Sequence, residues 1–155
     1  MNKHYQNTDF EALRVPQLEK IYNGINHSVE ELQGKMNNDM GRSFSKYDIL
    51  PRNFNIIPEI QKCSLHDLEL LEELAEKRFK CYWTMEKKKA EENGTLEQYY
   101  ATFMFYDFRN RMNDEQINEL FVRAEAYCHQ RMTTHKIIEC IMQAPNFLEE
   151  VWHEY

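Results

Sequence analysis

The chain has 155 residues, of which 42% are hydrophobic and 29% charged. This length and composition suit a globular core of ordinary size, which excludes wholesale disorder and a collagen-like repeat. Only four glycines and four prolines are present, too few for a turn-rich β-sandwich or for a glycine-rich phosphate-binding loop. The formal net charge of −7 repels phosphate groups, so it disfavours a nucleic-acid partner.

The compartment is indicated by the apolar runs and the cysteines. No apolar run approaches the roughly 20 residues that a bilayer span requires, and residues 1–7 lack the apolar core of a signal peptide. None of the four cysteines belongs to a Cys-x-x-Cys pair, so we expect all of them to be reduced core thiols. We therefore expect a cytoplasmic protein that does not act on membranes. The cysteines are Cys63, Cys81, Cys128 and Cys140.

The first third of the chain carries apolar residues at alternating spacings of three and four. This heptad pattern predicts a helix over about residues 16–36, with Pro16 in its first turn and a stop near Gly41. We expect the apolar seam to pack within the chain, with a homodimeric coiled coil as the alternative. A dimer of this kind would depend on Leu18, Tyr22, Ile25, Val29 and Leu32.

Residues 37–63 form the least regular stretch, because they contain two prolines and show no clear periodicity. They also carry many apolar residues, so we expect this segment to pack across the helices rather than to act as a linker. One short strand or helical turn is expected within it. No domain boundary is predicted here.

The remaining residues predict one helix after another. Ser64 is expected to cap the first of these helices, and Asn93-Gly94 to end it with a left-handed residue. A shorter helix is expected from Thr95 to about residue 112. A long helix is then expected from about residue 117 to 144, and a last short one after Asn146.

These elements together predict a single all-α domain over residues 1–155. Short connections make neighbouring helices run back on one another, so we expect an antiparallel bundle of about five helices. The heptad helix 16–36 and the irregular segment 37–63 would lie against a helical bundle formed by residues 64–155.

Histidines and carboxylates at helical spacing raise a metal-binding alternative. Glu125 with His129, and His135 with Glu139, each have i,i+4 spacing, which places two ligands on one helix face. The Glu-x-x-His pattern of di-iron bundles is absent, so surface pairing is the preferred interpretation and no cofactor is expected. No nucleophile motif or catalytic residue is found, so we expect no enzyme activity.

Negative charge is concentrated late in the chain. Residues 63–155 carry 11 basic and 18 acidic side chains, whereas residues 1–62 carry 8 of each. A helical surface lined with carboxylates such as Glu69, Glu72 and Glu73 can imitate the phosphate track of a nucleic acid and occupy a basic groove. Solubility alone is the plainer interpretation of these charges.

Two further stretches are candidates for binding. Six of the eleven residues in 98–108 are aromatic, which predicts either a central buried helix or an exposed binding surface. Arg42, Lys46 and Arg52 form a basic loop that offers weak binding to a nucleic acid or an acidic partner.

The preferred function is a non-enzymatic protein that binds another protein, as an inhibitor, adaptor or regulator. The expected partner is one such as a nucleic-acid-handling enzyme, and a homodimer stays open. The residue usage is also compatible with a phage or mobile-element product. A metal-binding bundle and a nucleic-acid binder that uses the loop 42–52 are the alternatives.

Overall fold

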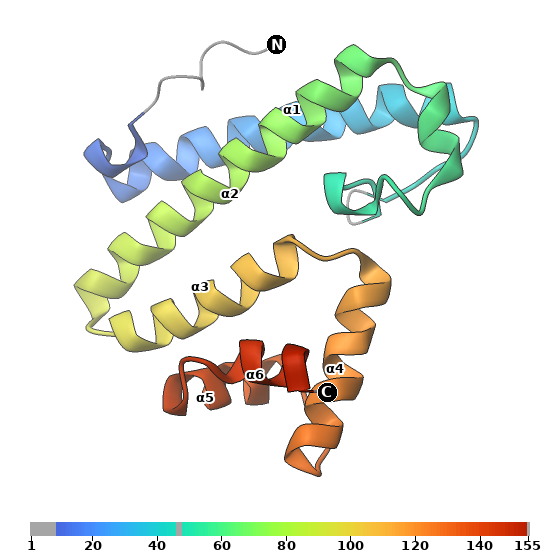
Figure 1. The fold of residues 1–155 in the computed structure, drawn as a ribbon. Helices are drawn as coiled ribbons and strands as arrows, with labels where there is room; N and C mark the ends of the chain where they lie inside the picture. The colour runs from blue at the N-terminus through green and yellow to red at the C-terminus, as the bar shows by residue number, and fades with distance from the viewer. Residues whose placement is uncertain (1–8, 46–47, 155) are drawn as a thin grey trace. The chain divides into compact units, whose positions relative to one another are not determined.

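The computed structural model describes residues 9–45 and 48–154, and these residues are all-α, which confirms the predicted fold class (Figure 1). Within these ranges there are six α-helices and three short 3₁₀ helices. The α-helices are α1 (Val15–Met40), α2 (Leu65–Asn93), α3 (Leu96–Asn110), α4 (Asp114–Cys128), α5 (Thr134–Gln143) and α6 (Phe147–Glu154). The 3₁₀ helices are η2 (Phe10–Ala12), η3 (Pro51–Asn53) and η4 (Pro58–Lys62).

The chain divides into two compact units, Met1–Lys89 and Ala90–Tyr155. Each unit has its own hydrophobic cluster of buried side chains. One domain over residues 1–155 is expected from the sequence. The two clusters form because the long helices α1 and α2 cover each other's apolar faces, while α3 to α6 bury a second apolar set among themselves.

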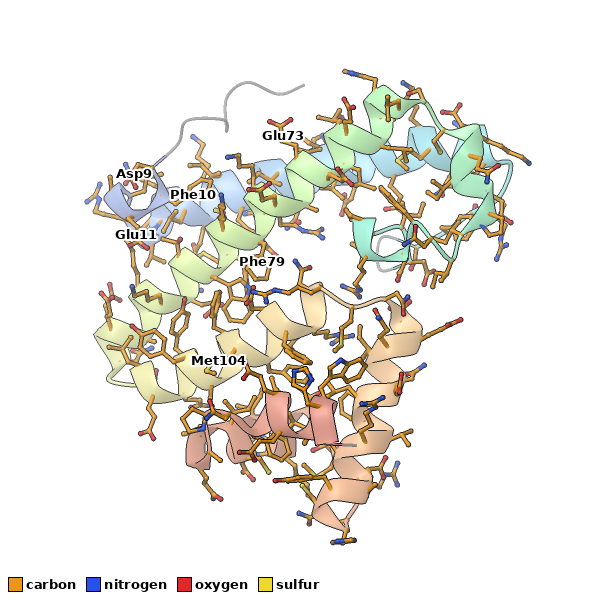
Figure 2. All side chains as sticks on the ribbon, in the orientation of Figure 1. Asp9, Phe10, Glu11, Glu73, Phe79 and Met104 are labelled. Atoms are coloured by element: carbon orange, nitrogen blue, oxygen red, sulfur yellow. The ribbon has the colours of Figure 1, made fainter. Side chains whose placement is uncertain are left out.

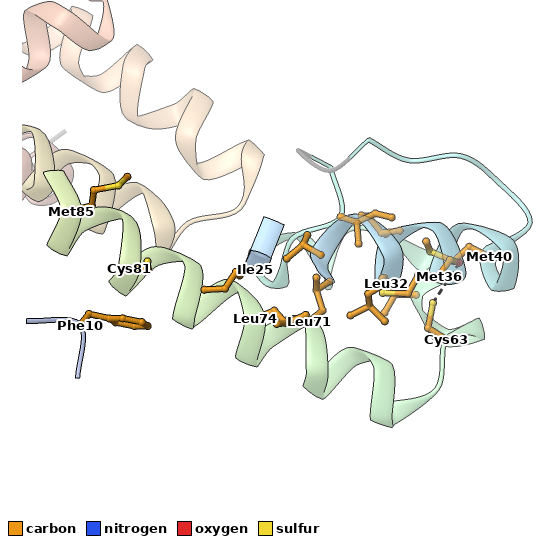
Figure 3. Packing of buried hydrophobic residues seen from close by; sticks show 14 of the residues in the cluster. Phe10, Ile25, Leu32, Met36, Met40, Cys63, Leu71, Leu74, Cys81 and Met85 are labelled. Atoms are coloured by element: carbon orange, nitrogen blue, oxygen red, sulfur yellow. Dashed lines mark hydrogen bonds between the residues drawn. The ribbon is translucent and has the colours of Figure 1, made fainter. Parts of the chain in front are cut away.

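In the first unit, α1 and α2 pack against each other in opposite directions (Figure 3). The Cys81 thiol, late in α2, donates a hydrogen bond to the carbonyl of Leu18, early in α1, over 3.4 Å. Just before α2 begins, the Cys63 thiol donates to the carbonyl of Met36, late in α1, over 3.9 Å. These two contacts show that α1 and α2 run antiparallel.

The predicted heptad seam forms the contact surface of α1. Leu18 and Ile25 are fully buried, and Val29 and Leu32 are almost so. Tyr22 is half-buried, with its ring 5.5 Å from the ring of Tyr82 on α2. The chain's own side chains therefore cover the seam, which is the packing expected within the chain.

Helix α1 runs four residues beyond its expected end, so the irregular segment is shorter than 37–63. Gly41 ends the helix in the left-handed region, with φ of 70°, a conformation that glycine adopts without strain. The next stretch is held to α1 because the Asn37 side chain accepts from the N–H of Phe44 and donates to its carbonyl. Where one short strand or helical turn is expected, the segment contains two short helical turns, η3 and η4.

The ends of α2 follow the sequence signals. Ser64 Oγ accepts a hydrogen bond from the N–H of Asp67 over 3.1 Å, which is the expected capping contact. At the other end, Gly94 has φ of 69° and ends the helix after Asn93. Thr95 precedes α3 but makes no capping bond through its side chain.

The single long helix expected over 117–144 is wrong, because α4 ends at Cys128 and α5 begins at Thr134. His129 takes the left-handed conformation, with φ of 55°, and ends α4. Thr133 then starts a new helix, because its side chain accepts from the N–H of Lys136 over 3.2 Å. This break gives six α-helices instead of about five.

In the second unit, α3 packs on α5, and α6 packs on both α4 and α5. Arg123 on α4 holds α6 in place: its guanidinium donates to the carbonyl of Trp152 and lies 4.5 Å from the centre of the Trp152 ring. Phe105 on α3 is fully buried in the cluster that these helices share.

Replacing Ile25 by alanine should lower the free energy of unfolding by about 3 kcal/mol, because it opens a cavity between α1 and α2. Val122, which is 66% exposed on α4, is the matched control, and Val122→Ala should change stability by less than about 0.5 kcal/mol. Urea unfolding followed by circular dichroism measures both. Equal effects of the two substitutions would contradict burial of the seam.

Replacing Thr133 by alanine should lower the free energy of unfolding by about 1 kcal/mol, because the N–H of Lys136 loses its side-chain acceptor. Thr134→Ala, one position further along, removes a similar hydroxyl with no role at the cap. Thermal unfolding of the two variants should show the larger loss for Thr133→Ala. If a continuous helix crossed this region, neither variant would show a capping effect.

Candidate protein-binding surface

The outer side of α2 carries a row of carboxylates at spacings of three and four residues. These spacings bring side chains onto one side of a helix. Leu71 and Leu74 are buried on the opposite side, against α1. The row therefore points away from the first unit's core, and Figure 2 labels Glu73 within it. Its members are Glu69, Glu72, Glu73 and Glu76.

Asp67 lies next to this row in sequence but belongs to the interior. It is only 2% exposed, and its carboxylate lies 3.1 and 3.0 Å from Nζ of Lys35 on α1. The hydrogen bond from Lys35 holds the pKa of Asp67 below its usual value, against the opposing effect of burial, and raises the pKa of Lys35. Asp67 therefore fastens α2 to α1 and is not free for a partner.

Glu76 is also paired, with Lys80 one turn further along at 3.0 Å. The hydrogen bond from Lys80 lowers the pKa of Glu76. Both side chains are exposed, so water screens this pair and it adds little stability.

Three carboxylates then remain for recognition. Among the residues that the structure describes, Glu69, Glu72 and Glu73 take part in no ion pair. Leu65, at the start of α2, is 70% exposed and lies one turn before Glu69 on the same side. We call these four residues the acidic face. It combines unpaired negative charge with one exposed apolar side chain.

The chain's net negative charge does not lie in the unit that carries the acidic face. The first unit, residues 1–89, carries 14 basic and 14 acidic side chains, whereas the second, residues 90–155, carries 5 basic and 12 acidic. All seven excess negative charges therefore belong to the second unit. The acidic face is a local feature of a unit without net charge, so its field extends only over short distances.

The basic loop is partly used within the first unit. Arg42 lies 3.5 Å from the carboxylate of Glu59 and 4.4 Å from the centre of the Phe44 ring. Arg52 is half-buried in η3. Lys46 lies outside the described residues. The structure therefore provides no described cluster of free basic side chains here.

The candidate metal ligands do not converge. His129 ends α4, whereas His135 lies in α5 and pairs with Glu139 at 2.8 Å on an exposed surface. Glu125 is half-exposed on α4. Among the described residues, no group of three or more His, Cys, Asp or Glu side chains is placed to hold a metal ion.

The aromatic helix α3 is only partly buried. Phe105 is fully buried, whereas Tyr100 and Met104 are 49% and 40% exposed. These two exposed residues lie four apart, on one side of α3. Together they form a small exposed surface on α3, in the acidic second unit.

Two of these features could not be read from the sequence. The spacing of Ser64 and Asp67 indicates a cap, but it carries no sign of Lys35, 32 positions away. Exposure of Leu65 has no sequence signal either, because its place in an apolar series suggests burial. The helix positions of Glu69, Glu72 and Glu73 give the signal that locates the acidic face.

No protein-family model matches the chain, and neither curated proteins nor solved structures give a match. Within the described residues, no helix is both long enough and apolar enough to span a membrane.

Replacing Asp67 by asparagine should lower stability at neutral pH, because Lys35 loses its charged acceptor. The pKa of Asp67 is lowered in the folded state, so its contribution is fully present above about pH 4 and is lost as the pH falls through the lowered value. Wild type and Asp67→Asn should therefore converge in acid.

Thermal unfolding between pH 7 and pH 2 measures this difference. Glu69→Gln, which neutralises an exposed carboxylate on the same helix, is the matched control and should change stability little at any pH. A constant gap between wild type and Asp67→Asn would contradict the charge pair.

Proposed function

We propose that this protein is a non-enzymatic binding protein whose acidic face recognises a basic surface of another protein. The observation that carries this proposal is the set of unpaired carboxylates at Glu69, Glu72 and Glu73 on one side of α2. Glu69 and Glu72 are exposed and Glu73 is half-buried, and a single-sign row of this kind attracts lysine and arginine side chains at short range.

The charge distribution favours recognition of a partner at contact distance over long-range electrostatic attraction. The first unit has no net charge, so the carboxylates act on a partner only once it is near. Leu65 adds an exposed apolar side chain at the end of the row, and apolar contacts strengthen interfaces that charge alone leaves weak. α2 is one continuous helix that packs on α1, so the row is held rigidly before binding.

The biological role follows from the partner class. A protein that fills a basic groove blocks or modulates the groove's usual ligand, so the role proposed is that of an inhibitor, adaptor or regulator. The groove of a nucleic-acid-handling enzyme fits this chemistry, because it is built to hold a line of phosphates. We place the protein in the cytoplasm, because all four cysteines are free thiols. Its origin in a phage or mobile element stays a prediction from composition.

The alternatives lack a favouring observation of this kind. Nucleic-acid binding would use Arg42 and Arg52, but Arg42 already pairs with Glu59 and stacks on Phe44. Metal binding would need ligands that meet, whereas among the described residues no group of three or more His, Cys, Asp or Glu side chains is placed to hold a metal ion.

Reversing three charges on the acidic face should weaken capture of the partner. The tagged full chain is used to purify partners from its native cell, with wild type compared with the Glu69→Lys, Glu72→Lys, Glu73→Lys triple variant. Like charges would then face each other across the interface, and we expect affinity for the captured protein to fall at least about tenfold. Quantitative mass spectrometry and then titration with the purified partner measure the loss.

The matched control is the triple variant Glu91→Lys, Glu92→Lys, Glu97→Lys. These residues are exposed and lie outside the acidic face, so the control changes net charge by the same amount at another place. Retained binding by the control and loss by the first variant support the acidic face. Equal loss in both would indicate a response to net charge, and unchanged binding in both would refute the proposal.

A further inference from the structure

The described methionines fall into two groups that differ in exposure. Five are buried in the hydrophobic clusters of the two units, each with an exposed fraction of 6% or less. Met104 on α3, labelled in Figure 2, and Met142 on α5 are 40% and 37% exposed. Met1 lies outside the described residues. The buried methionines are Met36, Met40, Met85, Met112 and Met132.

The helix positions of the two exposed methionines explain their exposure. Met104 precedes Phe105, which is fully buried, and Met142 follows Ile141, which is 2% exposed. The cluster of the second unit includes Phe105 and Ile141 but neither methionine. Consecutive residues of an α-helix point about 100° apart, so each methionine lies beside the packed side of its helix. Both side chains are therefore accessible to a small reagent while the helices stay packed.

We propose that Met104 and Met142 are modification sites at which hydrogen peroxide oxidises the thioether to a sulfoxide in the folded protein, while the five buried methionines stay reduced. This inference does not depend on the acidic face, which belongs to the first unit and contains no methionine.

The oxidation transfers one oxygen atom from the peroxide to sulfur. The thioether sulfur attacks one oxygen of the peroxide, the O–O bond breaks, and an S–O bond forms. The proton of the attacked oxygen passes to the departing hydroxide, which leaves as water. The sulfur loses two electrons and the peroxide gains them, so one thioether and one peroxide give one sulfoxide and one water.

The modification would change the surface of α3. Tyr100 and Met104 lie one turn apart, and both are exposed. A sulfoxide replaces the apolar thioether by a polar group that accepts hydrogen bonds, so this surface has an apolar reduced state and a polar oxidised state. Methionine sulfoxide reductases restore the thioether, which makes the change reversible.

Thioethers and thiols respond differently to pH. A thioether has no proton to lose, so its oxidation rate should be nearly the same at pH 6.5 and pH 8. Oxidation of a thiol requires the thiolate, and burial raises the pKa of Cys63, of Cys128 and, to about 11, of Cys81. The lower pH therefore separates oxidation of the methionines from oxidation of the cysteines.

The test exposes the folded full chain to hydrogen peroxide at pH 6.5 and stops the reaction at intervals with excess free methionine. Peptide mapping with fragment spectra then locates each added oxygen. Met104 and Met142 should react at least about tenfold faster than each buried methionine, because a buried thioether reacts only when the structure opens. In denaturant, all the described methionines should react at similar rates.

Stability gives a second readout of the same reaction. Because Met104 and Met142 are exposed, oxidation confined to them should shift the midpoint of thermal unfolding by less than about 2 °C. A sulfoxide in either hydrophobic cluster would place a polar group in the core and lower the midpoint by more.

Single variants assign the two sites. Met104→Leu and Met142→Leu should each lose one oxygen uptake and leave the rate at the other site unchanged. Met112→Leu, a substitution of similar volume at a buried position, is the matched control and should keep both uptakes. Where Met112→Leu fails to fold, as judged by circular dichroism, Met132→Leu takes its place.

Two outcomes would overturn the proposal. One is a rate at Met104 or Met142 in the folded chain as low as that of the buried methionines. The other is a buried methionine that reacts as fast as the two exposed ones while circular dichroism shows the native helix content.

Discussion

The apolar contact between α1 and α2 is the constraint on which the candidate binding surface depends. Leu18 and Ile25 from α1 are fully buried, as is Leu71 from α2. Burying such side chains contributes about 1.5–3 kcal/mol each, so α2 cannot rotate about its axis without exposing them. Because the opposite side of a helix is fixed once one side is packed, this contact also fixes the direction in which Glu69, Glu72 and Glu73 point.

Polar contacts fix the register of α1 and α2, that is, how far one helix is shifted along the other. Apolar side chains alone tolerate sliding of one helix along another, whereas Asp67 and Lys35 have one position in which they meet. A buried carboxylate that lost its partner would carry the full cost of desolvation, so shifted arrangements are disfavoured. The Ser64 hydroxyl holds the backbone N–H of Asp67 at the helix start. Asp67 thus holds α2 against α1, whereas the carboxylates that follow it on α2, Glu69, Glu72 and Glu73, take part in no described ion pair.

Sequence patterns located most of the helices because their signals are local. The spacing of the seam, Pro16 in the first turn of α1, and the glycine after Asn93 each act within a few residues. The break at His129 was missed, since a non-glycine residue in the left-handed region has no strong sequence signature and Thr133 lies within an apolar series. The pairing of Lys35 with Asp67 joins distant positions, which periodicity cannot reveal. The helical spacing of the carboxylates in the acidic face is visible in the sequence. Whether they form ion pairs depends on where every basic residue lies in the fold, which the sequence does not reveal.

The missed break has chemical consequences beyond the number of helices. In one continuous helix, Cys128 and Cys140 would lie about 18 Å apart along the axis, at a rise of 1.5 Å per residue. Ending α4 at Cys128 and restarting the chain at Thr134 lets both side chains pack against the hydrophobic cluster of the second unit. The same break places His129 at the end of α4, whereas His135 and Glu139 still pair at 2.8 Å within α5. A single residue in the left-handed conformation, His129, therefore decides where one helix ends and which side chains of the second unit share a helix face.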